Sequence, residues 1–167
     1  LREELGMPYV RCHGMFNGQL EAVAPDGSFH FEKPLTVLER ILDNGQIPFL
    51  ELSGMPGALA RTEESVCHYR FRSAPPRDWR RWEELVEQFL HVLIERFGRE
   101  ELCRWYFEVW NEPDLLAGHN PAFSAGFYAK LTRRTAAAVR AANPAAKIHT
   151  LSHANVREWL EAAGDAG

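Results

Sequence analysis

The sequence has few cysteines and little excess charge. Its three cysteines, Cys12, Cys67 and Cys103, are odd in number and lack the spacing of a metal site, so we expect buried thiols rather than a disulfide framework. The net charge of −4 and the lack of a basic run interleaved with aromatics argue against nucleic-acid binding. No apolar stretch approaches the roughly 20 residues that span a bilayer, so we expect no membrane partner.

The start of the chain has neither a Met nor a signal-peptide pattern. The opening Leu1-Arg2-Glu3-Glu4 looks internal, so the missing signal says little about location. We expect a soluble protein, in the cytoplasm rather than secreted, and leave its oligomeric state open. With 167 residues, of which 46% are apolar and 25% charged, the chain can bury one core and is expected to form a single domain over 1–167.

The hydrophobic pattern alternates between strand-like and helix-like segments. Asp78 is a plausible N-cap for the clearest helix, which Gly98 ends. Four strands interleaved with helices favour parallel crossovers, and hence an α/β sheet or barrel. The predicted strands are 7–13, 47–52, 103–110 and 147–151, and the predicted helices are about 34–44, 78–97, 123–142 and 154–163.

Length and the absence of glycine-rich motifs separate these two architectures. A complete eightfold barrel takes about 250 residues, so four strand–helix units are roughly half of one. An open nucleotide-binding sheet would usually show a glycine-rich turn, and neither G-x-G-x-x-G nor G-x-x-x-x-G-K occurs. We therefore expect a truncated barrel rather than a small open sheet.

The aromatic run Trp-Tyr-Phe-Glu-Val-Trp-Asn-Glu-Pro at 105–113 contains the strongest candidate for chemistry. It is typical of a buried parallel strand, and pairing should stop at Pro113, which cannot donate to the ladder. Glu112 would then lie at the carboxyl end of a buried strand, where barrel enzymes place their catalytic groups. On position alone, Glu112 could equally cap a following helix or pair with an arginine.

Three blocks of this sequence together resemble glycoside hydrolase family 39, which holds β-xylosidases and α-L-iduronidases. The resemblance covers most of residues 5–142 and also takes in Pro75-Pro76, Trp82, His91 and the turn at 96–98. It implies a (β/α)8 TIM barrel, of which this chain holds about strands 2–5 and lacks both ends. The blocks are Arg-Cys-His-Gly-Met-Phe at 11–16, Pro-Phe-Leu-Glu-Leu-Ser-Gly-Met-Pro at 48–56, and the run from Trp105 to Leu115.

The resemblance also implies roles for individual residues. Glu112 would be the general acid/base, Asn111 would bind the 2-hydroxyl of the sugar, and His13 would line the sugar pocket, unless His13 is hydrogen-bonded within the barrel core. In the retaining mechanism a second carboxyl, about 5–5.5 Å from the first, attacks the sugar. The acid must keep its proton near neutral pH through burial or a neighbouring carboxylate. The family's nucleophile is a Glu on strand seven, which we expect outside this chain.

Two other carboxylates fall near the predicted site. Glu108 shares strand parity with Glu112 but lies about 13 Å back along a regular strand, too far to be the nucleophile. We expect it to be a buried, paired carboxylate in the barrel interior. Glu51 ends the preceding strand and is not excluded by distance, although the resemblance gives it no such role.

The sequence departs from the family pattern at two places. Asp114 stands where Asn is common, and residues 148–153 replace the usual Gly-Gly-Pro-Ala stretch. His149 and His153 lie four apart, but no acidic third ligand follows at a recognisable spacing and 147–151 is a predicted strand, so we expect no metal and no cofactor.

Our hypothesis is a retaining O-glycosidase domain that acts on xyloside- or iduronide-type carbohydrates. One alternative is another Asn-Glu-Pro barrel glycosidase that acts on β-glucans or mannans. Another is a carbohydrate-binding or non-catalytic barrel remnant. Because half a barrel leaves sheet edges and apolar faces uncovered, we expect the isolated chain to aggregate and to show no turnover.

Overall fold

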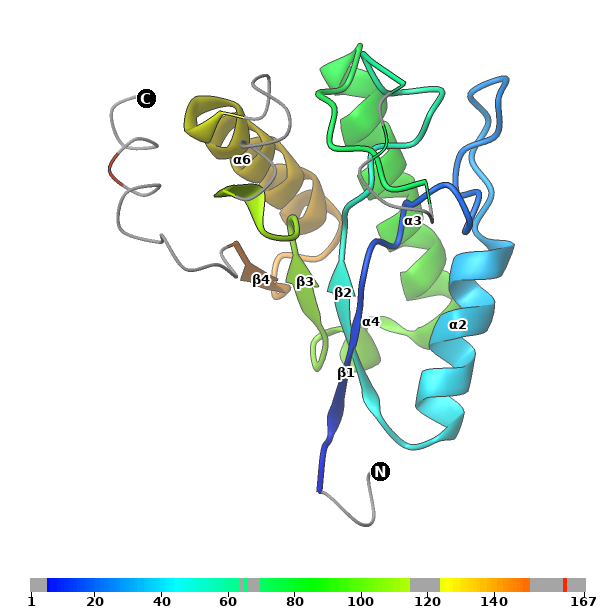
Figure 1. Cartoon of the computed structure of the whole chain (residues 1–167). Coiled ribbons are helices and arrows are strands. Elements are labelled where there is room, and N and C mark those ends of the chain that lie inside the picture. The colour runs from blue at the N-terminus through cyan, green and yellow to red at the C-terminus, as the bar shows by residue number, and fades with distance from the viewer. Residues whose placement is uncertain (1–5, 64, 66–69, 115–123, 151–160, 162–167) are drawn as a thin grey trace.

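Four parallel strands form a single sheet in the order β1-β2-β3-β4 (Figure 1). The computed structural model describes residues 6–63, 65, 70–114, 124–150 and 161. Each strand pairs with the next one along the chain, which is the arrangement of successive units in a (β/α)8 barrel. The strands are β1 (Tyr9–Cys12), β2 (Ile47–Glu51), β3 (Tyr106–Glu108) and β4 (Lys147–His149), and the helices are α2 (Glu32–Asp43), α3 (Trp79–Phe97), α4 (Arg99–Leu102) and α6 (Ala125–Ala142).

The predicted order of strands and helices is confirmed over the described residues. Asp78 caps α3 as expected, because its carboxylate accepts a hydrogen bond of 2.8 Å from the Arg80 amide. Gly98 follows α3 with a φ of +83°, a left-handed conformation that glycine adopts at little cost. The predicted helix at 154–163 lies, except for Glu161, outside the described residues.

The third strand is shorter than predicted at both ends. Residues 99–102 form α4, so β3 begins only at Tyr106. Pairing ends with the hydrogen bond of 3.0 Å from the Val109 amide to the His149 carbonyl, four residues before Pro113. The prediction that Pro113 stops the pairing was therefore wrong. Between the last paired residue and Pro113 the chain turns at Glu112, whose φ is +39°.

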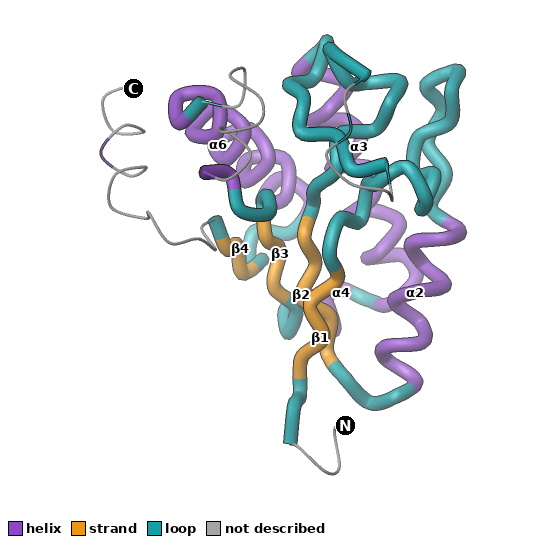
Figure 2. The backbone as a smooth tube through the Cα atoms, viewed as in Figure 1, coloured by secondary structure: helices purple, strands orange, loops and turns teal. Residues whose placement is uncertain are grey.

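Alternate residues of the strands face opposite layers. Leu50 and Phe107 are fully buried against the helices, where they join Trp82 and Phe89 of α3 in one core. Residues of α2, α3 and α6 share this core, and the tube in Figure 2 shows these helices flanking the sheet. In a (β/α)8 barrel, the face of the sheet that packs against the helices is the outer face of the barrel.

The opposite face of the sheet carries aromatic rings near its centre and charged groups at the carboxyl ends of the strands. Phe49 and Tyr106 stack with ring centroids 5.3 Å apart, and Tyr9 meets Tyr106 edge-on at 5.5 Å. Phe49 and Tyr106 are partly buried, and Tyr9 is exposed. In a closed barrel this face is the interior, so the charged groups lie at the end of the barrel where catalytic groups collect. Within the described ranges, no helix is both long and apolar enough to cross a membrane.

Candidate active site

Two buried carboxylates lie side by side at the ends of neighbouring strands. The parallel register pairs Glu51 of β2 with Glu108 of β3, and both side chains are 0% exposed. Arg11 of β1 bridges them: its Nε and Nη2 donate to Glu108 at 2.6 and 3.0 Å, and its Nη2 lies 2.7 Å from Glu51. The expectation that Glu108 is buried and paired is confirmed.

The charges around Arg11 favour its cationic form. Burial acts against the charge, but the hydrogen bond to Glu108 and the charges of Glu51, Glu108 and Glu112 together raise the pKa of Arg11. A carboxylate pair of this kind is stable in a buried layer only when a cation and further donors compensate it. Arg11 supplies that compensation.

His13 joins the same network two residues beyond Arg11, on the same side of the chain. Its Nδ1 lies 2.8 Å from Glu51 Oε2, and this hydrogen bond raises the pKa of His13. The imidazole stacks on Phe71 with centroids 5.3 Å apart and planes only 6° apart. With 35% of its side chain exposed, His13 lies at the rim of the site and is tied to Glu51 beneath it.

Gly14 makes the contact between His13 and Phe71 possible. Its φ is +69°, and a Cβ on it would lie 3.3 Å from the Phe71 ring. The chain turns here and then returns to β2, because the Met15 amide donates to the Glu51 carbonyl at 2.9 Å. The turn thus places His13 above Glu51 and against Phe71.

Asn111 and Glu112 lie beyond the end of β3, at the rim of the charged cluster. Asn111 Oδ1 accepts a hydrogen bond of 3.0 Å from Arg11 Nη2, while Asn111 Nδ2 lies 3.4 Å from Glu112 Oε2. Because β3 ends at Glu108 and Glu112 has a positive φ, strand alternation does not set the direction of Glu112. Glu112 is exposed, so of the two environments that we expected for it, burial or a neighbouring carboxylate, the described part of the chain does not supply burial.

The sequence did not reveal three members of this site. Arg11 was noted only as part of a family block, and neither Ser53, which donates to Glu51, nor Phe71 was singled out. One signal was available: Arg11 and His13 are two apart in a strand, as are Glu51 and Ser53, so each pair shares a face. Polar residues on one face of a buried strand indicate that this face borders a binding site rather than the hydrophobic core.

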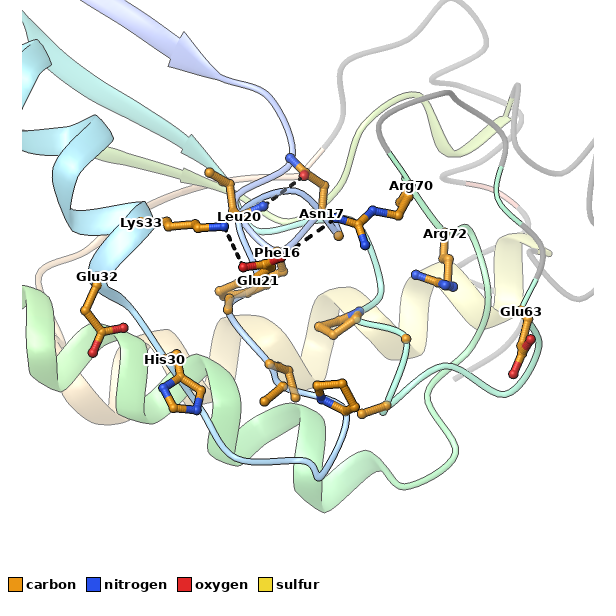
Figure 3. A pocket seen from close by; sticks show the side chains of 18 residues that line it. Phe16, Asn17, Leu20, Glu21, His30, Glu32, Lys33, Glu63, Arg70 and Arg72 are labelled. Atoms are coloured by element: carbon orange, nitrogen blue, oxygen red, sulfur yellow. Dashed lines mark hydrogen bonds and ion pairs between the residues drawn. The ribbon is translucent and has the colours of Figure 1, made fainter.

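A hollow of about 860 Å³ lies apart from this cluster, between the loops that follow β1 and β2 (Figure 3). Arg70 and Arg72 line it, whereas Phe71 between them contacts His13. Among the charged side chains of its wall, Glu21 lies 2.5 Å from Lys33 and 3.9 Å from Arg70. Neither His13 nor Glu112 lines this hollow, so it is separate from the candidate active site.

Metal binding has no support in the described residues. They contain no group of three or more His, Cys, Asp or Glu side chains placed to hold an ion. His153 lies outside the described residues, so this finding does not extend to it.

Comparison with known proteins identifies the family. The sequence pattern of glycosyl hydrolases family 39 matches residues 1–162. Over 118 residues the chain is 41% identical to the beta-xylosidase of Caldicellulosiruptor saccharolyticus, covering 68% of this chain and 24% of that protein. Over 150 residues it is 30% identical to the alpha-L-iduronidase of Homo sapiens, covering 86% of this chain and 21% of that protein.

A solved structure agrees with this match. The fold superimposes on the GH39 enzyme from Xanthomonas axonopodis pv. citri with a TM-score of 0.87 at 29% identity, covering 98% of this chain and 33% of that one. The chain thus spans about a fifth to a third of the proteins that it matches. The expectation of a TIM-barrel fragment is confirmed, and the chain belongs to glycosyl hydrolases family 39.

Proposed function

We propose that this chain carries the acid/base half of a retaining O-glycosidase site, with Glu112 as the general acid/base. The observation that carries the proposal is the contrast among three carboxylates at one end of the sheet. Glu51 and Glu108 are buried and bridged by Arg11, whereas Glu112 is exposed beside them. Glu112 is therefore the carboxyl group of the three that can reach a glycosidic oxygen.

The chemistry assigns a task to each group at the rim. Glu112 protonates the leaving oxygen and then activates the water that releases the sugar. Asn111 binds the 2-hydroxyl of the sugar, where a hydrogen bond strengthens in the transition state. His13 lines the sugar pocket above the Phe71 ring. A neutral amide beside Glu112 hydrogen-bonds the sugar without competing for the catalytic proton.

The attacking carboxylate comes from outside residues 1–167 in this proposal. Glu51 and Glu108 are both paired with Arg11, and an attack by either would take from this cation one of its two anionic partners. The substrates that we propose are xyloside- or iduronide-type glycosides, since relatives in the family are named beta-xylosidase and alpha-L-iduronidase. The domain would then be completed by strands that this chain does not contain.

Hydrolysis by the gene product at its natural length tests the assignment. Phenyl xylosides and phenyl iduronides, whose leaving group needs a proton, are the substrates, and Glu112→Gln should lower kcat/KM by about 10²- to 10⁴-fold. Glu95→Gln, which removes an exposed carboxylate from α3, is the matched control and should leave the rate unchanged.

Other outcomes separate the remaining hypotheses. Full activity in Glu112→Gln would refute the acid/base assignment. A wild-type protein that binds xylo-oligosaccharides without hydrolysing them would favour the non-catalytic remnant. Hydrolysis of β-glucans or mannans, with no action on xylosides or iduronides, would favour a different substrate class on the same scaffold.

A further inference from the structure

Glu51 is in contact with three other side chains of the site, although the proposed reaction gives it no step. It is 0% exposed and accepts hydrogen bonds on both oxygens. Ser53 Oγ donates to its Oε1, while His13 Nδ1 and Arg11 Nη2 lie 2.8 and 2.7 Å from its Oε2. A carboxylate held by a guanidinium and a hydroxyl acts as an acceptor, so the His13 nitrogen that faces it must carry a proton.

Phe71 fixes the plane of the same imidazole. It is 2% exposed and stacks on His13 at 5.3 Å with an interplanar angle of 6°. Trp110 in turn holds Phe71 edge-on at 5.8 Å and 67°. One contact sets which ring nitrogen is protonated and the other sets the direction of the ring, so together they leave His13 little orientational freedom.

We propose that Glu51 is a positioning residue which, with Phe71, holds His13 as the Nδ1-protonated tautomer and so presents Nε2 as an acceptor for a sugar hydroxyl. The proposal rests on the proposed function, because it takes the ligand of His13 to be a sugar. It assigns Glu51 an indirect role: Glu51 touches His13 and Arg11 and acts on the sugar through His13. The raised pKa of His13 agrees with an anionic partner at Nδ1.

Glu108 provides a matched control for Glu51. It ends the neighbouring strand in register with Glu51, is equally buried and binds the same arginine. Within the described residues, the carboxylate that is hydrogen-bonded to His13 is that of Glu51. Glu51→Gln and Glu108→Gln therefore remove the same charge from the same cluster, and differ in whether the partner of the His13 ring is changed.

Nitrogen NMR of the histidine side chains in the full-length gene product gives a readout that does not depend on activity. His13→Gln identifies the His13 signal. In the wild-type protein at a pH where the ring is neutral, Nδ1 should carry the proton. Glu51→Gln should shift the population toward the Nε2-protonated form and lower the pKa of His13, whereas Glu108→Gln should leave the tautomer unchanged.

Kinetics supply the second readout. A lost hydrogen bond between His13 and the sugar should raise KM about 2- to 10-fold, with a smaller change in kcat, in both Glu51→Gln and His13→Gln. The double variant Glu51→Gln/His13→Gln should be no worse than His13→Gln alone, since Glu51 acts through His13.

Three results would overturn the proposal: an Nε2-protonated His13 in the wild-type protein, an equal tautomer change in Glu108→Gln, or additive effects on KM in the double variant. If Glu51→Gln does not fold, the wild-type spectrum still decides. Failure of the proposed function looks different, because a protein that hydrolyses no glycoside can still show the Nδ1-protonated ring.

Discussion

Glu108 ends β3 and Glu112 lies four residues further along the chain, yet their surroundings are opposite. Glu108 is fully buried, paired in register with Glu51 and held at two atoms by Arg11. Glu112 is exposed, has a left-handed backbone and lies 3.4 Å from the amide of Asn111. One carboxylate is fixed in the scaffold, and the other is available to a ligand.

The difference shows how the site divides its work between two levels. The lower level consists of Arg11, Glu51 and Glu108, whose ion pairs join the ends of three strands. The upper level consists of His13, Asn111 and Glu112. It is attached to the lower one by a hydrogen bond that Arg11 donates to Asn111 and by one that His13 donates to Glu51. Groups that act on a substrate are placed most accurately when their own supports are rigid.

Removing Arg11 should have the largest effect on the lower level. Arg11→Met leaves two buried carboxylates without their cation. Breaking a fully buried ion pair costs about 3–5 kcal/mol of stability. Because solvent reaches the Arg11 guanidinium, we expect the free energy of unfolding to fall by about 3 kcal/mol, the lower end of that range. Urea unfolding of the full-length gene product measures the change.

The control for Arg11→Met is an exposed ion pair. Arg80→Met breaks the pair with Glu84 on α3, where the Arg80 side chain is 85% exposed. The expected loss is below about 0.5 kcal/mol. Equal losses in the two variants would mean that the Arg11 cluster is not a structural support.

The backbone at Glu112 predicts a smaller effect on the upper level. Its φ of +39° is costly for a residue with a Cβ, so Glu112→Gly should be more stable than Glu112→Ala by about 1 kcal/mol. Both variants lose the carboxylate, so the comparison isolates the backbone. A Glu112→Ala protein as stable as Glu112→Gly would show that the conformation is not strained.

The pH dependence of the His13 contact is the smallest effect. The hydrogen bond to Glu51 raises the pKa of His13 in the folded protein above its unfolded value of about 6.5. Its stabilisation is therefore complete below the unfolded pKa and is lost as the pH rises through the folded pKa. The stability difference between the wild type and His13→Gln should shrink over that range.

His91→Gln, which removes an exposed histidine from α3, corrects this measurement for the loss of a histidine in general. A difference between the wild type and His13→Gln that is flat or grows with pH would contradict an ionic partner at Nδ1.

Much of the upper level could be predicted from the sequence. The aromatic run ending in Asn111 and Glu112 marks a buried strand and its carboxyl end by composition alone.

The helix α3 could also be predicted from the sequence. Its apolar residues recur over many turns, and Asp78 and Gly98 mark its ends.

The lower level could not be predicted in the same way. Arg11 and Glu108 are 97 residues apart, and their contact depends on strand register, which local patterns do not encode. The end of β3 was missed for a related reason: an aromatic run favours a strand, but the left-handed turn at Glu112 comes from its tertiary surroundings rather than from a glycine.

The dependence of the rate on the leaving group tests the central claim most directly. A general acid matters when the leaving group is a poor one, because a phenol of low pKa departs without a proton. In the full-length gene product, Glu112→Ala should lower kcat/KM for phenyl glycosides by about 10²- to 10⁴-fold and leave dinitrophenyl glycosides nearly unaffected. An equal loss on both substrates would contradict the assignment of Glu112 as the proton donor.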